Sequence, residues 1–192
     1  MKTLLAWIGG LSLAAIAAIL ATAAAGWYDV GADAPHAAPV EAALDWGRRR
    51  AIAAHAPAER IALPEGEAAL RRGAAHYAEM CAGCHMAPAT EDREMRDGLY
   101  PRPPDFTKTR PDPSTAFWTI KHGIKMSAMP AWGAAHDDAS ILAIVAFLQR
   151  LPGMDDATYR RLTGTEAAET AKESAPQAPA EPHEPHHHHH PH

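Results

Sequence analysis

The run Cys81-Ala82-Gly83-Cys84-His85 is the feature that most constrains how this chain folds. Two cysteines separated by two residues and followed at once by a histidine are typical of a site where haem is attached covalently. The two thiols would form thioether bonds to the porphyrin, and the imidazole of His85 would bind the iron from one face. A chain with this run has to arrange its other elements around a large, flat, apolar group.

The same cysteines admit two other interpretations, and both are weaker. A disulfide redox motif shares the C-x-x-C spacing, but it belongs beside a strand–helix–strand pattern, and strand-like runs are scarce in this sequence. A structural zinc site needs four cysteine or histidine ligands, usually from two clusters, and the chain has only 2 cysteines in 192 residues. The sequence therefore predicts one covalent haem c at Cys81 and Cys84.

The start of the chain predicts a membrane anchor. Residues 4–26 carry no charge and are rich in Leu, Ile and Ala, and about 20 such residues span a bilayer as a helix. Lys2 favours a cytoplasmic start, which places the rest of the chain in the periplasm. A signal peptide cleaved at an A-x-A site is the alternative, but the length of the apolar run favours a single-pass anchor over residues 1–26 in the bacterial inner membrane.

Composition divides the rest of the chain into three segments. Residues 27–64 are rich in Ala and Pro and are predicted to be a periplasmic spacer, whose Arg48-Arg49-Arg50 triplet either contacts lipid head groups or, more commonly, lies on a solvated helix face. Residues 65–163 are predicted to form the haem-binding domain. Residues 164–192 lack large apolar side chains and are predicted to be a disordered tail rich in histidine.

The pattern of apolar residues predicts an all-α fold, with no alternating strand pattern. A helix is expected over residues 67–80, where apolar side chains recur at the helical period, and it leads directly into Cys81. Residues 86–111 are expected to be a proline-rich loop. A final helix is expected over residues 139–151, and Pro152 and Gly153 end it.

Local signals also predict where these helices begin and end. Asp112 and Pro113 are typical of an N-cap and a first helical residue, and Gly123 would end that short helix. Asp137 or Asp138 would cap the final helix.

The charge and the size of the chain limit the classes of partner. The formal net charge of −5 is too small to imply a strongly polarised partner, and nothing indicates nucleic acid. A domain of about a hundred residues is marginal for apolar burial alone, so a haem would supply much of its interior.

These features together resemble the class I c-type cytochromes over residues 65–153. Gly73 precedes the haem motif, and Met129-Pro130 precedes a final helix that carries the aromatic side chain of Phe147. The resemblance implies an all-α shell whose first and last helices cross at a glycine–aromatic contact, here Gly73 against Phe147. It also implies that the iron has a histidine ligand on one face, His85, and a methionine on the other.

Met129 and Met126 are the two candidates for the methionine ligand, since both lie in the loop after Gly123. The backbone before a proline is held towards the extended region, so the loop is stiffer at Met129 than at Met126 and loses less entropy when the sulfur binds. The resemblance also favours a methionine before proline. Met129 is therefore preferred as the distal ligand, and Met126 is the second choice.

The resemblance further implies that a proline carbonyl in the first loop accepts the other N–H of His85 and so fixes the imidazole. Pro101, Pro103 and Pro104 all remain candidates for this role.

The resemblance implies a one-electron carrier rather than an enzyme, because a His/Met-ligated iron has no open position for a substrate. Such a protein would pass electrons between membrane or periplasmic redox proteins of a respiratory chain: a dehydrogenase, a quinol-oxidising complex, a copper enzyme or a terminal oxidase. Burial and a thioether ligand would raise its reduction potential.

Two other functions stay open. If Met129 left the iron, the chain could act as a peroxidase-like haem enzyme. The histidines at residues 183, 186–190 and 192 could bind or sense Cu, Zn or Ni, although an expression tag would also explain them.

Overall fold

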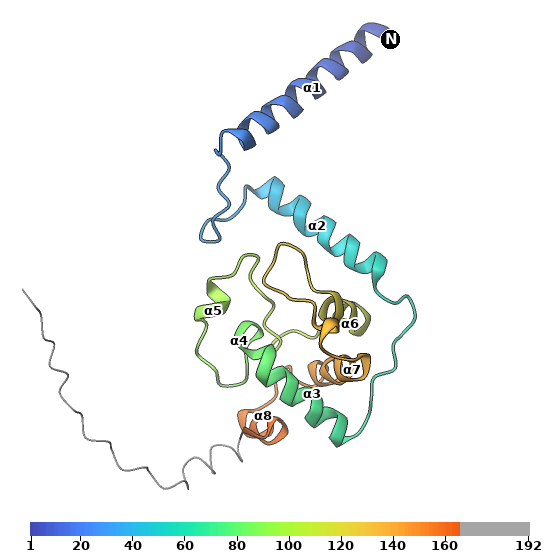
Figure 1. Ribbon diagram of the computed structural model, residues 1–192, viewed down its shortest axis with the longest axis vertical. Helices are drawn as coiled ribbons and strands as arrows, with labels where there is room; N and C mark the ends of the chain where they lie inside the picture. Colours follow the sequence, from blue (N-terminus) through green and yellow to red (C-terminus); the bar gives the residue numbers. More distant parts are fainter. Residues whose placement is uncertain (166–192) are drawn as a thin grey trace, which may run out of the picture.

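Figure 1 shows a long N-terminal helix standing away from a group of shorter helices, with a second helix between them. The computed structural model describes residues 1–165, so all but the first two residues of the predicted tail lie outside it. The elements in chain order are α1 (Lys2–Ala24), α2 (Ala38–His55), α3 (Glu67–Met80), α4 (Ala82–His85), α5 (Glu94–Asp97), α6 (Pro113–His122), the 3-10 helix η1 (Trp132–Ala134), α7 (Asp138–Leu148) and α8 (Asp156–Thr163). No strand occurs among the described residues, and the prediction of an all-α fold is confirmed.

The helix α1 is apolar and exposed along almost its whole length. By its length and composition it is able to cross a membrane. A signal sequence has the same properties, so the retained single-pass anchor stays a prediction.

The core of the domain forms where α3 crosses α7. A Cβ atom on Gly73 would lie 2.0 Å from the carbonyl oxygen of Ala143, so only glycine lets the two backbones come this close. The expected crossing of the first and last helices at Gly73 is therefore observed, and the atoms of α7 nearest to this glycine belong to the backbone of Ala143 and Ile144. Phe147 lies one helical turn further on and packs against Tyr77, with 5.4 Å between the ring centroids. The buried core around this crossing also includes Ala74, Ile141, Ile144, Val145, Leu148 and Leu151.

The predicted caps of two helices are confirmed. The side chain of Asp112 accepts a hydrogen bond from the backbone N–H of Thr115 at 3.0 Å, with Pro113 as the first residue of α6. Of the two aspartates proposed for α7, Asp137 is the cap, and it accepts from the backbone N–H of Ser140 at 2.8 Å.

Two of the helices that the sequence pattern did not predict lie in the loop after the haem motif and after α7. The short α5 interrupts the expected loop of residues 86–111, and α8 follows α7 after a brief turn. Asp155 caps α8 by accepting from the backbone N–H of Thr158 at 2.8 Å, and Gly164 ends it in the left-handed conformation. Tyr159 and Leu162 are the buried residues of α8.

The segment between α1 and α3 is held against the domain near each end of α2. Before α2, the hydroxyl of Tyr28 lies 2.7 Å from Nδ1 of His36, and the backbone N–H of His36 donates to the hydroxyl of Tyr100 at 3.3 Å. At the other end of α2, the ring of His55 lies 5.7 Å from the ring of Trp118 in α6. The predicted spacer therefore includes a helix that packs on the rest of the protein.

Candidate cofactor site

One turn of helix carries both thiols and the imidazole. α3 ends at Met80, and the carbonyl of Cys81 then accepts the backbone N–H groups of Cys84 and His85 at 3.1 and 2.9 Å. Three side chains with metal-binding or nucleophilic atoms therefore project from five consecutive residues, as the sequence predicted.

The environment of Cys81 differs from that of a reactive redox thiol. Both lie in the described part of the chain, and neither forms a disulfide. Burial, with a smaller contribution from Cys84, raises the pKa of Cys81 to about 12. Redox C-x-x-C pairs work through a thiol whose pKa is lowered, so this environment argues against the disulfide redox interpretation.

The ring of His85 is fixed by a backbone carbonyl. Its Nδ1 lies 2.9 Å from the carbonyl oxygen of Pro104. A carbonyl only accepts, so Nδ1 carries the proton and Nε2 keeps a lone pair for a metal. Of the three prolines left open by the sequence, Pro104 makes this bond. The ring of Phe106 stacks on the imidazole, with 4.6 Å between the centroids.

The environment of His85 favours the neutral imidazole that metal ligation requires. Burial lowers the pKa of His85 below its usual value, and the nearby guanidinium of Arg96 acts in the same direction. The hydrogen bond to Pro104 opposes both effects.

Arg96, on α5, is a residue of this site that no sequence pattern indicated. Its Nε donates to the carbonyl of Pro103 at 3.1 Å, and its side chain is only 13% exposed. The carbonyls of Pro103 and Pro104 are thus held by two different donors. Because the bond from Arg96 fixes the backbone next to Pro104, it helps to orient the acceptor of the His85 proton.

The hydroxyl of Tyr77 contacts the backbone at the end of the same turn. Its hydroxyl lies 3.1 Å from the carbonyl oxygen of His85 and 2.6 Å from that of Met86, and it donates its single proton mainly over the shorter distance. Burial raises the pKa of Tyr77, so the hydroxyl stays protonated. Met86 has φ 71° and ψ 155°, a conformation that costs a residue with a side chain about 1–3 kcal/mol. The bond from Tyr77 helps to hold Met86 in this conformation.

Replacing Tyr77 with phenylalanine is therefore expected to destabilise the domain. The carbonyl of Met86 would be left buried without its donor, which costs about 1–3 kcal/mol in the free energy of unfolding. Denaturant unfolding followed by circular dichroism measures this loss. Tyr159→Phe is the matched control, because the Tyr159 hydroxyl makes no hydrogen bond within residues 1–165. Equal losses in the two variants would contradict the role given to the Tyr77 hydroxyl.

The loop that carries the two candidate methionine ligands is closed by its own hydrogen bonds. The backbone N–H of Ile124 donates to the carbonyl of Met129 at 3.1 Å, and the Ser127 hydroxyl bridges Ile124 O and Met129 N at 2.8 and 3.2 Å. Gly123 stands at its base with φ 67°, where a Cβ would lie 2.7 Å from the backbone nitrogen of Ala131. The loop is therefore a compact unit whose two ends touch.

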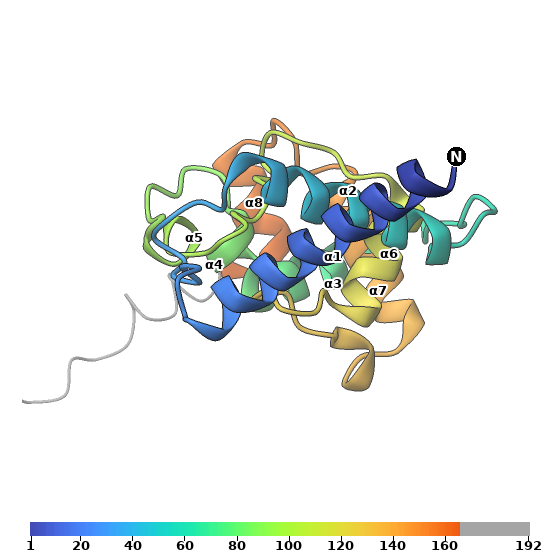
Figure 2. The ribbon, with the colours of Figure 1, turned by 90° about the horizontal axis from the view of Figure 1, so that it is seen from above.

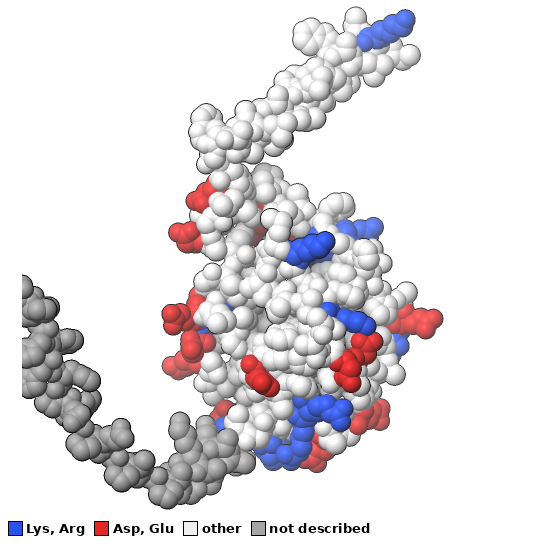
Figure 3. Space-filling model, in the orientation of Figure 1, with Lys and Arg blue, Asp and Glu red and all other residues white. Residues whose placement is uncertain are grey.

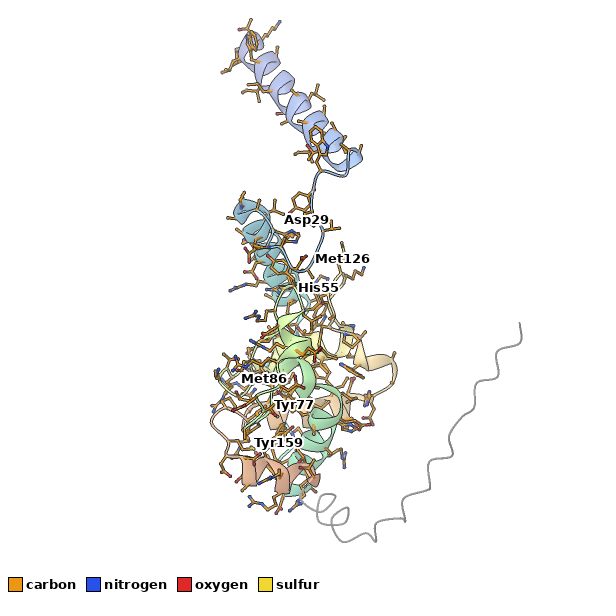
Figure 4. The ribbon with its side chains drawn as sticks, turned by 90° about the vertical axis from the view of Figure 1, so that its left-hand side faces the viewer. Asp29, His55, Tyr77, Met86, Met126 and Tyr159 are labelled. Atoms are coloured by element: carbon orange, nitrogen blue, oxygen red, sulfur yellow. The ribbon has the colours of Figure 1, made fainter. Side chains whose placement is uncertain are left out.

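Met129 and Met126 occupy different environments in this loop. Met129 is half-buried and packs against the core cluster. Met126 is fully exposed, with φ 56°, and Figure 4 shows it at the α2 end of the molecule, away from Tyr77 and Met86 in the interior. The surroundings of the two sulfur atoms therefore favour Met129 as a ligand.

His136 is a second residue near this loop that sequence reasoning missed. Its Nδ1 is buried and has no hydrogen-bond partner in the described part of the chain. Its ring lies edge-on to Trp132 at 5.7 Å and to His76 at 5.2 Å between centroids. The ring of His136 therefore packs against Trp132 and His76, and no pattern in the sequence indicated this.

The residues of this site fit a covalently bound haem. Cys81 and Cys84 offer two unpaired thiols on one turn, and His85 offers Nε2 in a fixed orientation. Large apolar side chains that are only partly buried lie beside the core cluster, namely Phe106, Phe117, Met129 and Trp132. Imidazole and thioether donors suit a haem iron. The predicted residues Cys81, Cys84 and His85 thus come together, and the two methionines lie on a separate loop after α6.

Comparison with known protein families supports the same chemistry. Residues 68–148 match the family described as cytochrome c oxidase, cbb3-type, subunit III. The match begins in α3 and ends with α7, so it includes the turn of the cysteines and the methionine loop. No curated protein and no solved structure matches the chain.

Proposed function

We propose that this chain, a class I c-type cytochrome over residues 68–148, carries single electrons through one covalent haem c held by Cys81, Cys84, His85 and Met129. The family implies haem-based electron transfer and a covalent haem c. The observation that best supports these residues is the His85 ring, which is fixed by the Pro104 carbonyl and follows Cys84 directly on a single helical turn.

The residues of the chain would have three roles in this function. The thioether bonds at Cys81 and Cys84 would hold the haem irreversibly. His85 would bind the iron through Nε2, with its orientation set by the Pro104 carbonyl. Met129 would bind the other face, and its sulfur would favour the reduced iron and so raise the reduction potential. With both faces filled, the chain would exchange electrons and not bind a substrate.

We also propose where the protein works. α1 would anchor it in the bacterial inner membrane, residues 27–64 would connect the anchor, and residues 65–163 would form the haem domain in the periplasm. The family implies redox protein partners in a respiratory chain. A dehydrogenase, a quinol-oxidising complex, a copper enzyme or a terminal oxidase would each fit, and electron-transfer contacts of this kind are small and transient.

The test of this function is the covalent bond to haem. After extraction with acidified acetone, the polypeptide should keep the mass of one haem. Thioether bonds survive this treatment, whereas it removes a haem that is held only by its iron ligands and non-covalent contacts. Intact-mass spectrometry measures the mass. The double variant Cys81→Ala/Cys84→Ala is the control and should lose its haem in the same extraction. A wild-type chain that emerges at the mass of the bare polypeptide would contradict the proposal.

A further inference from the structure

Two opposite faces of α2 have different surroundings. Half-buried side chains recur on the face turned to the domain, at Asp45, Arg48 and Ile52. The residues of the opposite face recur at spacings of three or four and are all exposed, namely Pro39, Ala43, Trp46, Arg50 and Ala54. A helix face that meets only water usually carries several charged or polar side chains, whereas this one carries a tryptophan, a single cation and small apolar residues.

The outer face of α2 carries one charged side chain, the guanidinium of Arg50. The carboxylate of Asp45 is paired with the guanidinium of Arg48 and, at 2.7 Å, with that of Arg49. Arg50 has no acidic partner among the described residues. Figure 3 shows the surface over α2 as largely uncharged, with basic side chains on it.

The contacts at both ends of α2 fix the position of this helix on the domain. His36 is joined to Tyr100 before the helix, and His55 packs on Trp118 at its end. Figures 1 and 2 show α2 running across the direction of α1 and lying between α1 and the rest of the domain. A helix that spans a bilayer runs along the membrane normal, so a helix crosswise to it runs along the membrane surface.

We infer that the outer face of α2 lies on the surface of the bilayer, with Trp46 at the interface and Arg50 on anionic lipid head groups. The inference rests on the anchoring by α1 proposed above. Trp46 is 68% exposed, and tryptophan favours the level of the head groups. The interaction free energy of an arginine with anionic head groups is about as favourable as that of a surface ion pair in a protein.

The short connection from the anchor makes even a weak contact effective. Residues 25–37 join α1 to α2, and even without the contacts of Tyr28 and His36 a chain of this length would have an average end-to-end distance of only ~20 Å. A tether this short holds the face at an effective concentration of the order of millimolar at the membrane. The small apolar side chains of this face would bind lipid only weakly on their own, so the contact with the bilayer depends on the tether.

The experiment measures how well lipid shields the outer face in the full chain with its haem. Ala43→Cys places a reactive thiol on this face without changing Trp46 or Arg50, and Ala157→Cys places one on the exposed surface of α8 as the matched control. The two native thiols would be blocked by the haem. In nanodiscs that contain anionic lipid, a water-soluble maleimide should modify Ala43→Cys at least tenfold more slowly than Ala157→Cys.

Two added substitutions and a second lipid composition identify the source of the shielding. Adding Trp46→Ala and Arg50→Gln to Ala43→Cys should bring its rate within about twofold of the control, and zwitterionic discs should give less shielding than anionic ones. Unchanged visible spectra would show that each variant keeps its haem fold. Equal rates at the two thiols in anionic discs overturn the inference.

The anchor is tested separately by retention of the chain in membranes washed with carbonate. Retention together with equal thiol rates overturns only the contact of α2 with lipid, and leaves this face to a protein partner. Loss of the chain from the washed membranes overturns both the anchor and the inference.

Discussion

Met129→Ala is expected to remove the distal iron ligand and lower the reduction potential by on the order of 100 mV, a fraction of the roughly 0.8 V over which axial ligands set haem potentials. The soft sulfur stabilises the reduced iron more than the oxidised iron, so its loss favours oxidation. The weak long-wavelength absorption band of a thioether bound to Fe(III) should disappear as well. Potentiometric titration and the visible spectrum of the oxidised protein measure the two effects.

Met126→Ala is the matched control, because Met126 lies in the same loop with its side chain fully exposed. Its potential and its long-wavelength band should stay close to those of the wild type. In the reverse outcome, the band would be lost in Met126→Ala and kept in Met129→Ala. This would mean that the loop changes conformation when haem is bound and that Met126 is the ligand.

Among substitutions that add one methyl group to a glycine of the domain, Gly73→Ala is expected to lower the free energy of unfolding most. The new Cβ would lie 2.0 Å from Ala143 O and 3.0 Å from Ile144 N, and both are backbone atoms that no side-chain rotation can move. Alanine gains about 1 kcal/mol over glycine inside a helix, but the forced separation of α3 and α7 costs about 3 kcal/mol or more. The clash therefore decides the sign, and denaturant unfolding of the haem protein measures the loss.

The control for this variant is Gly47→Ala. Gly47 also lies inside a helix, α2, but a Cβ there would have nothing within 4 Å. It should gain up to about 1 kcal/mol from helix propensity alone. If Gly73→Ala were as stable as Gly47→Ala, the close approach of α3 and α7 would be wrong.

The sequence predicted those helices whose signals are local. Apolar periodicity placed a helix over residues 67–80, and α3 has these bounds. Asp112 and Asp137 cap the helices that follow them, as their positions indicated. α8 was missed because only Tyr159 and Leu162 of its side chains are buried, too few to produce a periodic pattern beside its arginines. Asp155 and Gly164 were the signals that could have found it.

Contacts between distant segments were harder to predict. The sequence showed that Gly73 would allow a close crossing, but not that the backbone of Ala143 would be the part of α7 nearest to it. The register of two helices depends on every side chain that packs around the contact. For the same reason, spacing alone could not select Pro104 among three prolines, and nothing near Arg96 marked it as the donor to Pro103.

The closed methionine loop has a consequence for the speed of electron exchange. An electron moves between two proteins only when the geometry around each iron is compatible with both oxidation states, and the energy needed to reach that geometry is the reorganisation energy. Ile124 and Ser127 hold the backbone of Met129 on both sides, so a sulfur carried there would shift little when the iron gains or loses an electron. A stiff loop would thus keep the barrier low, and exchange with each partner would be limited by encounter and not by rearrangement of the ligand.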